Sequence, residues 1–303
     1  MTATTFPSPP ARAEVDAAPL HPVPRRGAVL RAQLRATRDA IQKEAMLAGL
    51  FVLGVGIFLL ASRAASPTGR PSDMQFAEVI LPLVLMGVFG PVALWKGEAP
   101  ARRSYFWSMP VDRMPHTLFK VFSGWVWLMA LAAAYVLWAW ALARLSGGVL
   151  SLGDTQVALP VPQGAPRGSA GYAFHPWPVP AWQWVVPFTA ATTMYLLGSI
   201  VVIRSNYPWR WFAGVVLTWV LLLMVQGGAE RFLIDVVAEG RYGLEVLLTG
   251  GETRTSMIPA PGGERVLVAY VEPMPERWAI ATLLWMGAAL AGLILAARPH
   301  QEG

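Results

Sequence analysis

The sequence contains no cysteine and carries little charge. Of its 303 residues, 14% are Asp, Glu, Lys or Arg, whereas soluble domains carry about 25%. Without cysteine the chain has no disulfide, no thiolate metal site and no cysteine nucleophile. The small charged fraction, together with 55% hydrophobic residues and several long apolar runs, indicates a membrane protein.

The motifs of nucleotide hydrolysis and metal binding are also missing. The sequence has no G-x-x-x-x-G-K-[ST] run, so this chain does not hydrolyse ATP through a P-loop. Its four histidines are scattered and form no His-x-x-x-His pair, which argues against a metal site. We therefore expect this chain to bind no cofactor. The histidines are His21, His116, His175 and His300.

The apolar runs contain no recognisable catalytic set. Gly198 and Ser199 match a fragment of a serine-protease motif, but no apolar run contains a histidine to serve as the base. Two small residues in a row also allow helices to approach closely, and this is the role we expect for them. An intramembrane hydrolase remains an alternative without candidate residues, and we expect this chain not to be an enzyme.

Six segments approach the length of about 20 apolar residues that a helix needs to cross a bilayer. Tryptophan is frequent at their ends, as in the aromatic belts of membrane interfaces. The sequence thus predicts an all-α polytopic membrane protein with six transmembrane helices. The predicted spans are 45–62, 76–95, 118–143, 182–203, 209–226 and 278–297.

The distribution of Lys and Arg predicts the orientation. Seven of these residues precede position 45, and five lie in 96–120, between the second and third spans. Basic residues close to the spans mark the cytoplasmic side, so both termini and the loop 97–117 are predicted to be cytoplasmic. The net charge of +6 is explained in the same way and does not call for a nucleic-acid partner.

The two longest loops, 145–181 and 227–277, are then extracytoplasmic. The first contains several prolines and glycines and is predicted to be irregular or to form short strands. In the second, an apolar face predicts a short helix near 232–237. The run "ERVLVAYVEP" predicts a strand, which we pair in a hairpin with 245–249.

The N-terminal region has two parts. Residues 1–24 are rich in Pro and Ala and lack the apolar core of a secretory signal, so we predict a disordered cytoplasmic tail. The membrane domain is assigned to 25–303. Just before the first span, apolar positions recur at helical spacing beside a stripe of Arg31, Arg35 and Arg38. We interpret this segment as an amphipathic helix in the membrane interface; an ordinary solvated cationic helix is the alternative.

The second span contains two prolines, Pro82 and Pro91. Proline removes a backbone donor and bends a helix. Kinked spans line cavities or move in many transporters, and kinks also occur routinely in membrane helices. Whether these two prolines are gating kinks or routine kinks of a membrane helix stays open at this point.

The polar stretch "LWKGEAPARRSYFWSMPVDRMPHTLFKVFSGW" joins the second and third spans. It resembles the cytoplasmic loop of the permease subunits of exporter-type (type-2) ABC transporters, where an acidic residue, a short helix and a Ser-x-Pro-Val-x-Arg-like turn follow one another. In place of the family's aliphatic short helix, this chain has a cationic and aromatic one, with Arg102, Arg103, Tyr105, Phe106 and Trp107. The residues that match the family's order are Glu98, Ser108, Pro110, Val111, Arg113 and Lys120.

This resemblance implies a membrane subunit of an ATP-driven exporter in a bacterial inner membrane. The subunit would form its pathway as a homodimer or with a similar permease chain. A separate cytoplasmic ABC ATPase subunit would hold ATP and Mg. The loop would be the coupling segment that docks on this ATPase, through Glu98, Arg102, Arg103, Tyr105, Phe106, Trp107, Pro110 and Arg113.

A non-transport function is the alternative interpretation of the same loop. Clustered aromatics and arginines anchor many protein interfaces. An integral membrane scaffold that recruits a soluble partner through 97–117 would use the same residue types. The sequence does not name a transported substrate under either interpretation.

Overall fold

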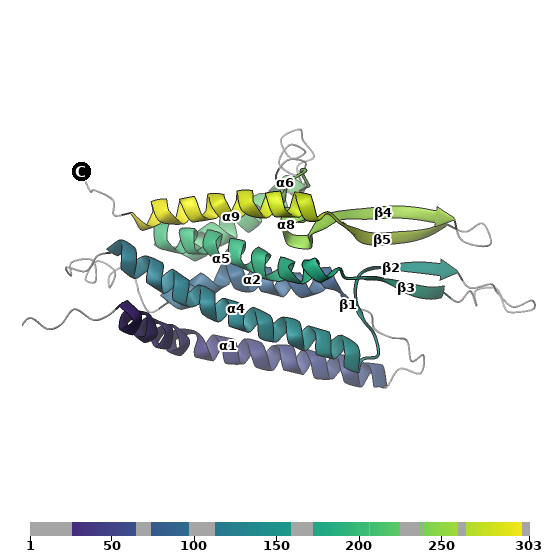
Figure 1. The fold of residues 1–303 in the computed structure, drawn as a ribbon, viewed down its shortest axis with the longest axis horizontal. Helices are drawn as coiled ribbons and strands as arrows, with labels where there is room; N and C mark the ends of the chain where they lie inside the picture. The colour runs from purple at the N-terminus through teal and green to yellow at the C-terminus, as the bar shows by residue number, and fades with distance from the viewer. Residues whose placement is uncertain are drawn as a thin grey trace, which may run out of the picture.

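The computed structural model describes residues 26–64, 74–96, 113–158, 172–205, 207–224, 237, 239–259 and 265–298. Long helices lie lengthwise side by side, and β-strands project from one end of them (Figure 1). The helices are α1 (Arg26–Ala64), α2 (Phe76–Trp95), α4 (Arg113–Leu145), α5 (Val186–Arg204), α6 (Pro208–Met224), α8 (Leu244–Thr249) and α9 (Pro275–Ala297), and a 3-10 helix, η1 (Ala181–Val185), leads into α5.

Five helical segments are long and apolar enough to cross a membrane: Gly27–Ala61, Phe76–Trp95, Met114–Leu145, Ala181–Arg204 and Pro275–Ala297. The multi-pass helical membrane architecture predicted from the sequence is therefore confirmed. The predicted fifth span, 209–226, corresponds to α6, whose described part has 17 residues and is not among these five.

The helix α4 is much longer than a bilayer requires. Its 33 residues correspond to about 50 Å at about 1.5 Å per residue, against a hydrocarbon core of about 30 Å. The predicted span 118–143 leaves out the first five and the last two residues of this helix. One end of α4 therefore extends beyond the hydrocarbon region, and its first turns carry Arg113 and His116.

The helices α2 and α5 form the centre of the bundle. Glycines allow their backbones to approach: a Cβ atom on Gly87 would lie 2.7 Å from the carbonyl oxygen of Ala191, and one on Gly198 would collide with the carbonyl of Val88. Ser199 is buried and donates its hydroxyl to the carbonyl of Tyr195 at 2.7 Å. Gly198 and Ser199 thus have the packing role expected from their small size.

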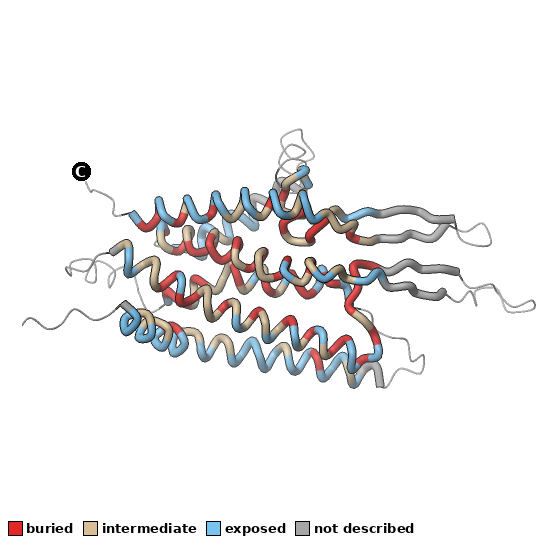
Figure 2. The backbone as a smooth tube through the Cα atoms, viewed as in Figure 1, coloured by how far each residue is buried: buried red, intermediate tan, exposed pale blue. Residues whose placement is uncertain are grey.

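Apolar side chains face outward on the peripheral helices. Figure 2 shows α5 mostly buried, whereas α1 and the outer side of α9 are largely exposed. Phe51 is 73% exposed on α1, and Leu283 is 74% exposed on α9. Exposed Leu and Phe at this density on helices of spanning length are typical of surfaces that face lipid.

The helix α1 is continuous but does not run straight along α4. The indole of Trp127 donates to the carbonyl of Leu34 at 3.1 Å, and the ring of Trp138 lies against Gly56. The two contacts are separated by twice as many residues on α1 as on α4. If both helices were straight and parallel, the same number of residues would separate the contacts on each. The first part of α1 is therefore turned away from the direction of the rest, as its darkest turns show in Figure 1.

The burial of this turned part follows the predicted stripe. Thr37 is buried, and Leu30, Leu34 and Ile41 are partly buried, whereas the arginines of the neighbouring stripe are exposed. An amphipathic segment lying across the bundle is the arrangement expected of an interfacial helix. The exposed arginines are Arg31, Arg35 and Arg38.

Five strands form one sheet beyond the bundle: β1 (Met74–Gln75), β2 (Leu150–Ala158), β3 (Tyr172–Pro178), β4 (Gly251–Pro259) and β5 (Arg265–Pro273). The strand β2 pairs with β1 in parallel and with β3 and β5 in antiparallel orientation, and β4 and β5 form a hairpin. Both long loops thus contribute strands to a single sheet.

One predicted strand is wrong. Residues 245–249 belong to α8, and the hairpin partner of β5 is β4. The short helix ends at Gly250, whose φ of 78° is a left-handed conformation that glycine adopts without strain. The strand β4 begins directly after it, at Gly251. The predicted helix near 232–237 lies almost entirely outside the described residues.

Candidate functional site

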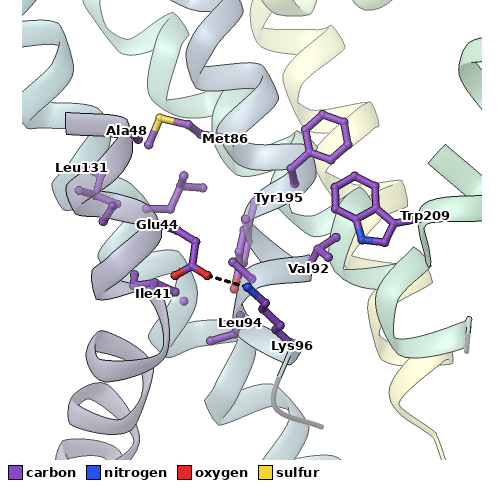
Figure 3. Close-up of a pocket in the computed structure, with 16 residues that line it drawn as sticks. Ile41, Glu44, Ala48, Met86, Val92, Leu94, Lys96, Leu131, Tyr195 and Trp209 are labelled. Atoms are coloured by element: carbon purple, nitrogen blue, oxygen red, sulfur yellow. Dashed lines mark hydrogen bonds and ion pairs between the residues drawn. The ribbon is translucent and has the colours of Figure 1, made fainter. Parts of the chain in front are cut away.

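A cavity of about 420 Å³ lies among α1, α2, α4, α5 and α6. Figure 3 shows its position, with α1 on one side and Trp209 of α6 on the other. Almost all of the lining is apolar. The lining residues are Ile41, Glu44, Ala45, Ala48, Met86, Phe89, Gly90, Val92, Ala93, Leu94, Lys96, Gly124, Leu128, Leu131, Tyr195 and Trp209.

An ion pair stands at one end of the cavity. The ammonium of Lys96, just after α2, lies 3.2 Å from a carboxylate oxygen of Glu44 on α1 (Figure 3). Both side chains are accessible, Lys96 at 77% and Glu44 at 41%. An exposed pair of this kind adds little stability, so its main effect is to place one cation and one anion beside an apolar space.

The wall on the α6 side is aromatic. The rings of Phe89 and Trp209 stack with centroids 5.6 Å apart, and Phe212 meets Phe89 edge-on at 5.2 Å. Trp209 is 60% exposed, so this wall continues from the cavity to the surface. Such rings offer a large apolar face at a low cost in side-chain entropy.

The α5 side of the cavity is held in place by Tyr195. Its buried hydroxyl donates to the carbonyl of Val121 at 2.8 Å. The ring fits against Gly124, where a Cβ atom would collide with the tyrosine hydroxyl. This contact packs α5 closely against α4 on that side of the cavity.

The two prolines of the second span lie inside α2, which continues as one helix through both. Pro91 is buried and Pro82 is partly buried. Pro91 directly follows Gly90, which lines the cavity, and a Cβ atom on Gly90 would have nothing within 4 Å. Of the two predicted kink positions, Pro91 is thus next to the cavity. Their role as gating kinks stays a prediction.

Most of the predicted coupling segment lies outside the described residues, namely Glu98, Arg102, Arg103, Tyr105, Phe106, Trp107 and Pro110. Its two boundaries are described. Lys96 follows α2 and Arg113 begins α4, and both helix ends lie at the end of the bundle opposite the sheet (Figure 1). The segment therefore starts and finishes at one end of the molecule.

At this end, α2 and α4 are joined by a cation–π contact that the sequence did not predict. The ammonium of Lys120 lies 4.2 Å from the ring centroid of Trp95. Lys120 is only 8% exposed, and such contacts gain strength when the cation is desolvated. The contact ties the last residue of α2 to the second turn of α4, on either side of the coupling segment.

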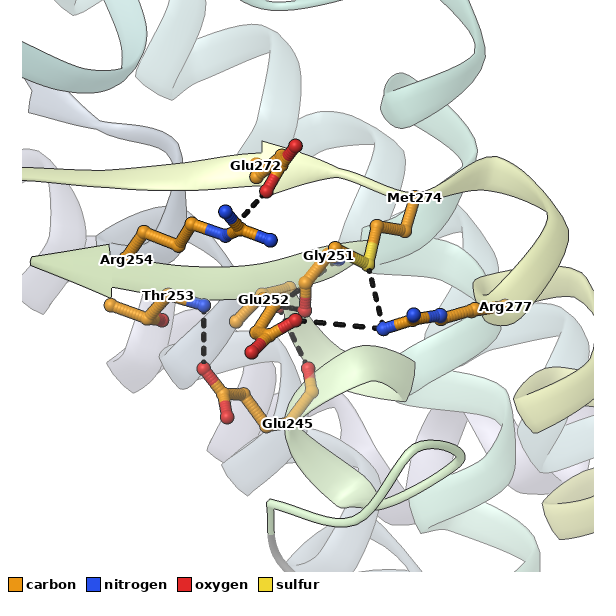
Figure 4. Close-up of polar contacts among 9 residues, drawn as sticks. Glu245, Gly251, Glu252, Thr253, Arg254, Glu272, Met274 and Arg277 are labelled. Atoms are coloured by element: carbon orange, nitrogen blue, oxygen red, sulfur yellow. Dashed lines mark hydrogen bonds and ion pairs between the residues drawn. The ribbon is translucent and has the colours of Figure 1, made fainter.

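A cluster of charges lies at the opposite end, where the sheet meets the bundle (Figure 4). Arg254 pairs with Glu272 across the hairpin, and Arg277 of α9 lies 3.5 Å from Glu252. Glu245 of α8 accepts the backbone N–H of Thr253 at 2.8 Å. The contacts of Glu252 and Thr253 attach the hairpin to α9 and α8. Within the described ranges, no group of His, Asp or Glu is arranged to hold a metal ion.

The two ends of the molecule thus differ: one carries a sheet held by charge pairs, and the other carries an apolar cavity, a cationic helix and the boundaries of the coupling segment. Comparisons of the chain with protein-family models, with curated proteins and with solved structures find no match.

Proposed function

We propose that this chain is the membrane subunit of an ATP-driven exporter of the type-2 ABC class. The supporting observation is that the coupling segment starts and finishes at the bundle end that also carries the cationic part of α1. Positive charge near the spans favours the cytoplasmic side for that end, which is where a soluble ATPase has access. The proposed docking residues are Glu98, Arg102, Arg103, Tyr105, Phe106, Trp107, Pro110 and Arg113.

We further propose six crossings. The helix α5 finishes at Arg204, at the end opposite the sheet. Later in the chain, the carbonyl of Tyr242 accepts the indole N–H of Trp285, near the middle of α9, which begins directly after β5 of the sheet. These two positions support a passage of the chain along the bundle between them. The 17 residues of α6 would cover about 25 Å of this path.

The absence of cysteine allows this topology to be tested directly. We expect Thr253→Cys in β4 to react with a membrane-impermeant maleimide added outside intact spheroplasts. Ala28→Cys at the start of α1 and Arg298→Cys after α9 should react only after permeabilisation. All three positions are exposed, so differences in labelling report the side of the membrane. Labelling of Ala28→Cys in intact cells would contradict the cytoplasmic N-terminus.

In the proposed mechanism, ATP and Mg²⁺ bind to the partner ATPase and not to this chain. Two copies of the chain, or one copy with a similar permease, form the pathway. Closure of the ATPase moves the coupling segment, and the segment is continuous with α2 and α4 on either side. Because Lys120 packs on Trp95 at this joint, we expect the two helix ends to move together.

The function itself is tested by purification from native membranes. We expect affinity-tagged full-length protein to retain a cytoplasmic ATPase carrying P-loop motifs, in equal numbers of the two subunits. The matched control is a variant in which Phe106 and Trp107 are both replaced by alanine, and it should lose this ATPase while still inserting into the membrane. A retained partner without nucleotide-binding motifs would instead favour the scaffold interpretation.

A further inference from the structure

We infer that the cavity among α1, α2, α4, α5 and α6 binds an anionic amphiphile. Its apolar chain would lie in the cavity, and its acidic head would meet Lys96 at the mouth. Binding is a property of this chain alone. Only the further step of naming the amphiphile as the exported cargo depends on the proposed exporter function.

The lining suits an apolar chain. Apart from the pair Glu44 and Lys96 and the hydroxyl of Tyr195, the cavity is surrounded by aliphatic and aromatic side chains and by glycine. That hydroxyl is already used in a hydrogen bond to Val121. The volume of about 420 Å³ is nearly three times that of the engineered cavity of about 150 Å³ that binds benzene. It also lies within the range of about 300–1,000 Å³ that is usual for ligand pockets.

The charge at the mouth favours an acidic head. Between residues 27 and 45, α1 carries four cations and two carboxylates. Arg210 follows Trp209 in the chain, and its guanidinium lies 4.4 Å from the ring centroid of Tyr207. Lys96 has three N–H donors and is 77% exposed, so it can contact Glu44 and a ligand at the same time. A carboxylate or phosphate head thus gains a charge-assisted hydrogen bond from Lys96, and the excess of cations along α1 favours it over a cationic head, which could meet only Glu44 among the lining residues.

The residues on the two sides of the cavity mouth indicate the direction from which the ligand arrives. On one side, the turned part of α1 lies across the bundle near Ile41 and Glu44. On the other, the exposed ring of Trp209 continues the cavity wall to the surface. An amphiphile in the membrane has its charged head at the interface and its apolar chain deeper in the bilayer. The cavity has the same arrangement, with its charged mouth at the level of α1 and its apolar interior beyond.

Gly90 provides a position from which a larger side chain would fill the cavity. A Cβ atom there meets nothing within 4 Å, and the residue lines the cavity. Gly287 on α9 is equally open but faces outward, so Gly287→Leu is the matched control for Gly90→Leu. Both changes replace a helical glycine with a better helix former. Because Gly90 directly precedes Pro91, which disfavours the helical conformation of a residue that has a Cβ atom, elution and melting of each variant are checked first. If Gly90→Leu does not melt like the parent protein, Ala48→Leu at another lining position takes its place.

The test uses the full-length protein in nanodiscs of phosphatidylcholine, with a fluorescent long-chain fatty acid as the probe and the alcohol of the same chain as its neutral counterpart. We expect the acid to bind at least about tenfold more tightly than the alcohol. Gly90→Leu should weaken binding of both probes by about tenfold or more, whereas Gly287→Leu should leave it unchanged. Equal binding by both glycine variants would overturn the assignment of the cavity.

The head contact is tested separately with Lys96→Gln. This change should remove most of the preference for the acid while the alcohol binds as before. If the preference persists in Lys96→Gln, the proposed position of the head is wrong. Nanodiscs of phosphatidylglycerol distinguish the sources of the ligand. If the acid probe binds more weakly in them, the bilayer's own anionic lipid occupies the cavity. If the affinity of the probe is unchanged, a free single-chain acid is the ligand. No ATPase is present in this assay. Absence of probe binding would therefore leave the exporter proposal intact, and failure to co-purify an ATPase would leave the binding result intact.

Discussion

Replacing Gly198 with leucine is expected to abolish folding of the helical bundle. In the centre of the molecule, a Cβ atom on Gly198 would collide with the backbone carbonyl of Val88 on α2. A backbone carbonyl cannot rotate away as a flexible side chain can, so α2 and α5 would have to separate. Overpacking a close contact costs about 1–3 kcal/mol for added methylenes, and we expect the four-carbon side chain to exceed this range.

Fluorescence-detected size-exclusion chromatography and thermal unfolding measure this effect. The Gly198→Leu variant should be absent from the monodisperse peak, and Gly198→Ala should lie between it and the parent protein. Gly287→Leu serves as the control, because its position is open and the same side chain would point away from the bundle. A Gly198→Leu variant that melts at the parental temperature would show that α2 and α5 do not pack as closely as described.

The double change Phe106→Ala with Trp107→Ala is expected to separate transport from ATP hydrolysis. The strongest aromatic anchors at interfaces contribute about 2 kcal/mol or more each, so removing two of this strength should weaken docking of the ATPase by about a thousandfold. Membrane insertion should be unaffected, because neither residue lies in a predicted span. In reconstituted vesicles, transport should be lost while the ATPase continues to hydrolyse ATP at its basal rate.

A matched control removes two aromatics at the opposite end of the molecule. Trp177 and Tyr270 stack on the external sheet with centroids 4.7 Å apart, and their double replacement by alanine should preserve docking and transport. Normal transport in the Phe106 and Trp107 variant would mean that these rings only rest at the membrane interface. The coupling role of the segment 97–117 would then be abandoned.

Several elements were predictable from local sequence. The bounds of α2, Phe76–Trp95, coincide with the predicted second span, and α9 starts three residues before the predicted last span. Hydropathy identifies such helices because the cost of burying a segment in lipid depends on its own residues. The stripe formed by Leu30, Leu34, Thr37 and Ile41 likewise follows from helical periodicity, and it is the side of α1 that is less exposed.

The external region was less predictable, because strand pairing depends on distant segments. The strand β2 joins parts of the chain from Met74 to Tyr270, and no local pattern indicates these partners. The segment 245–249 is apolar enough for either a strand or a short helix. Its helical form depends on packing at the junction, where buried Gln183 donates to the carbonyl of Thr249 at 2.7 Å.

By itself, the sequence determined that this is a multi-pass membrane protein, where most of its long helices lie, and which segment carries the cationic stripe and the clustered aromatics. These properties are sums over neighbouring residues. The tertiary structure decided which helices adjoin, and with them the cavity and its mouth. Glu44 and Lys96 meet across 52 residues, and the cavity wall combines five helices. Such a site exists only once distant segments have packed together, since the shape of the space depends on the gap that their side chains leave.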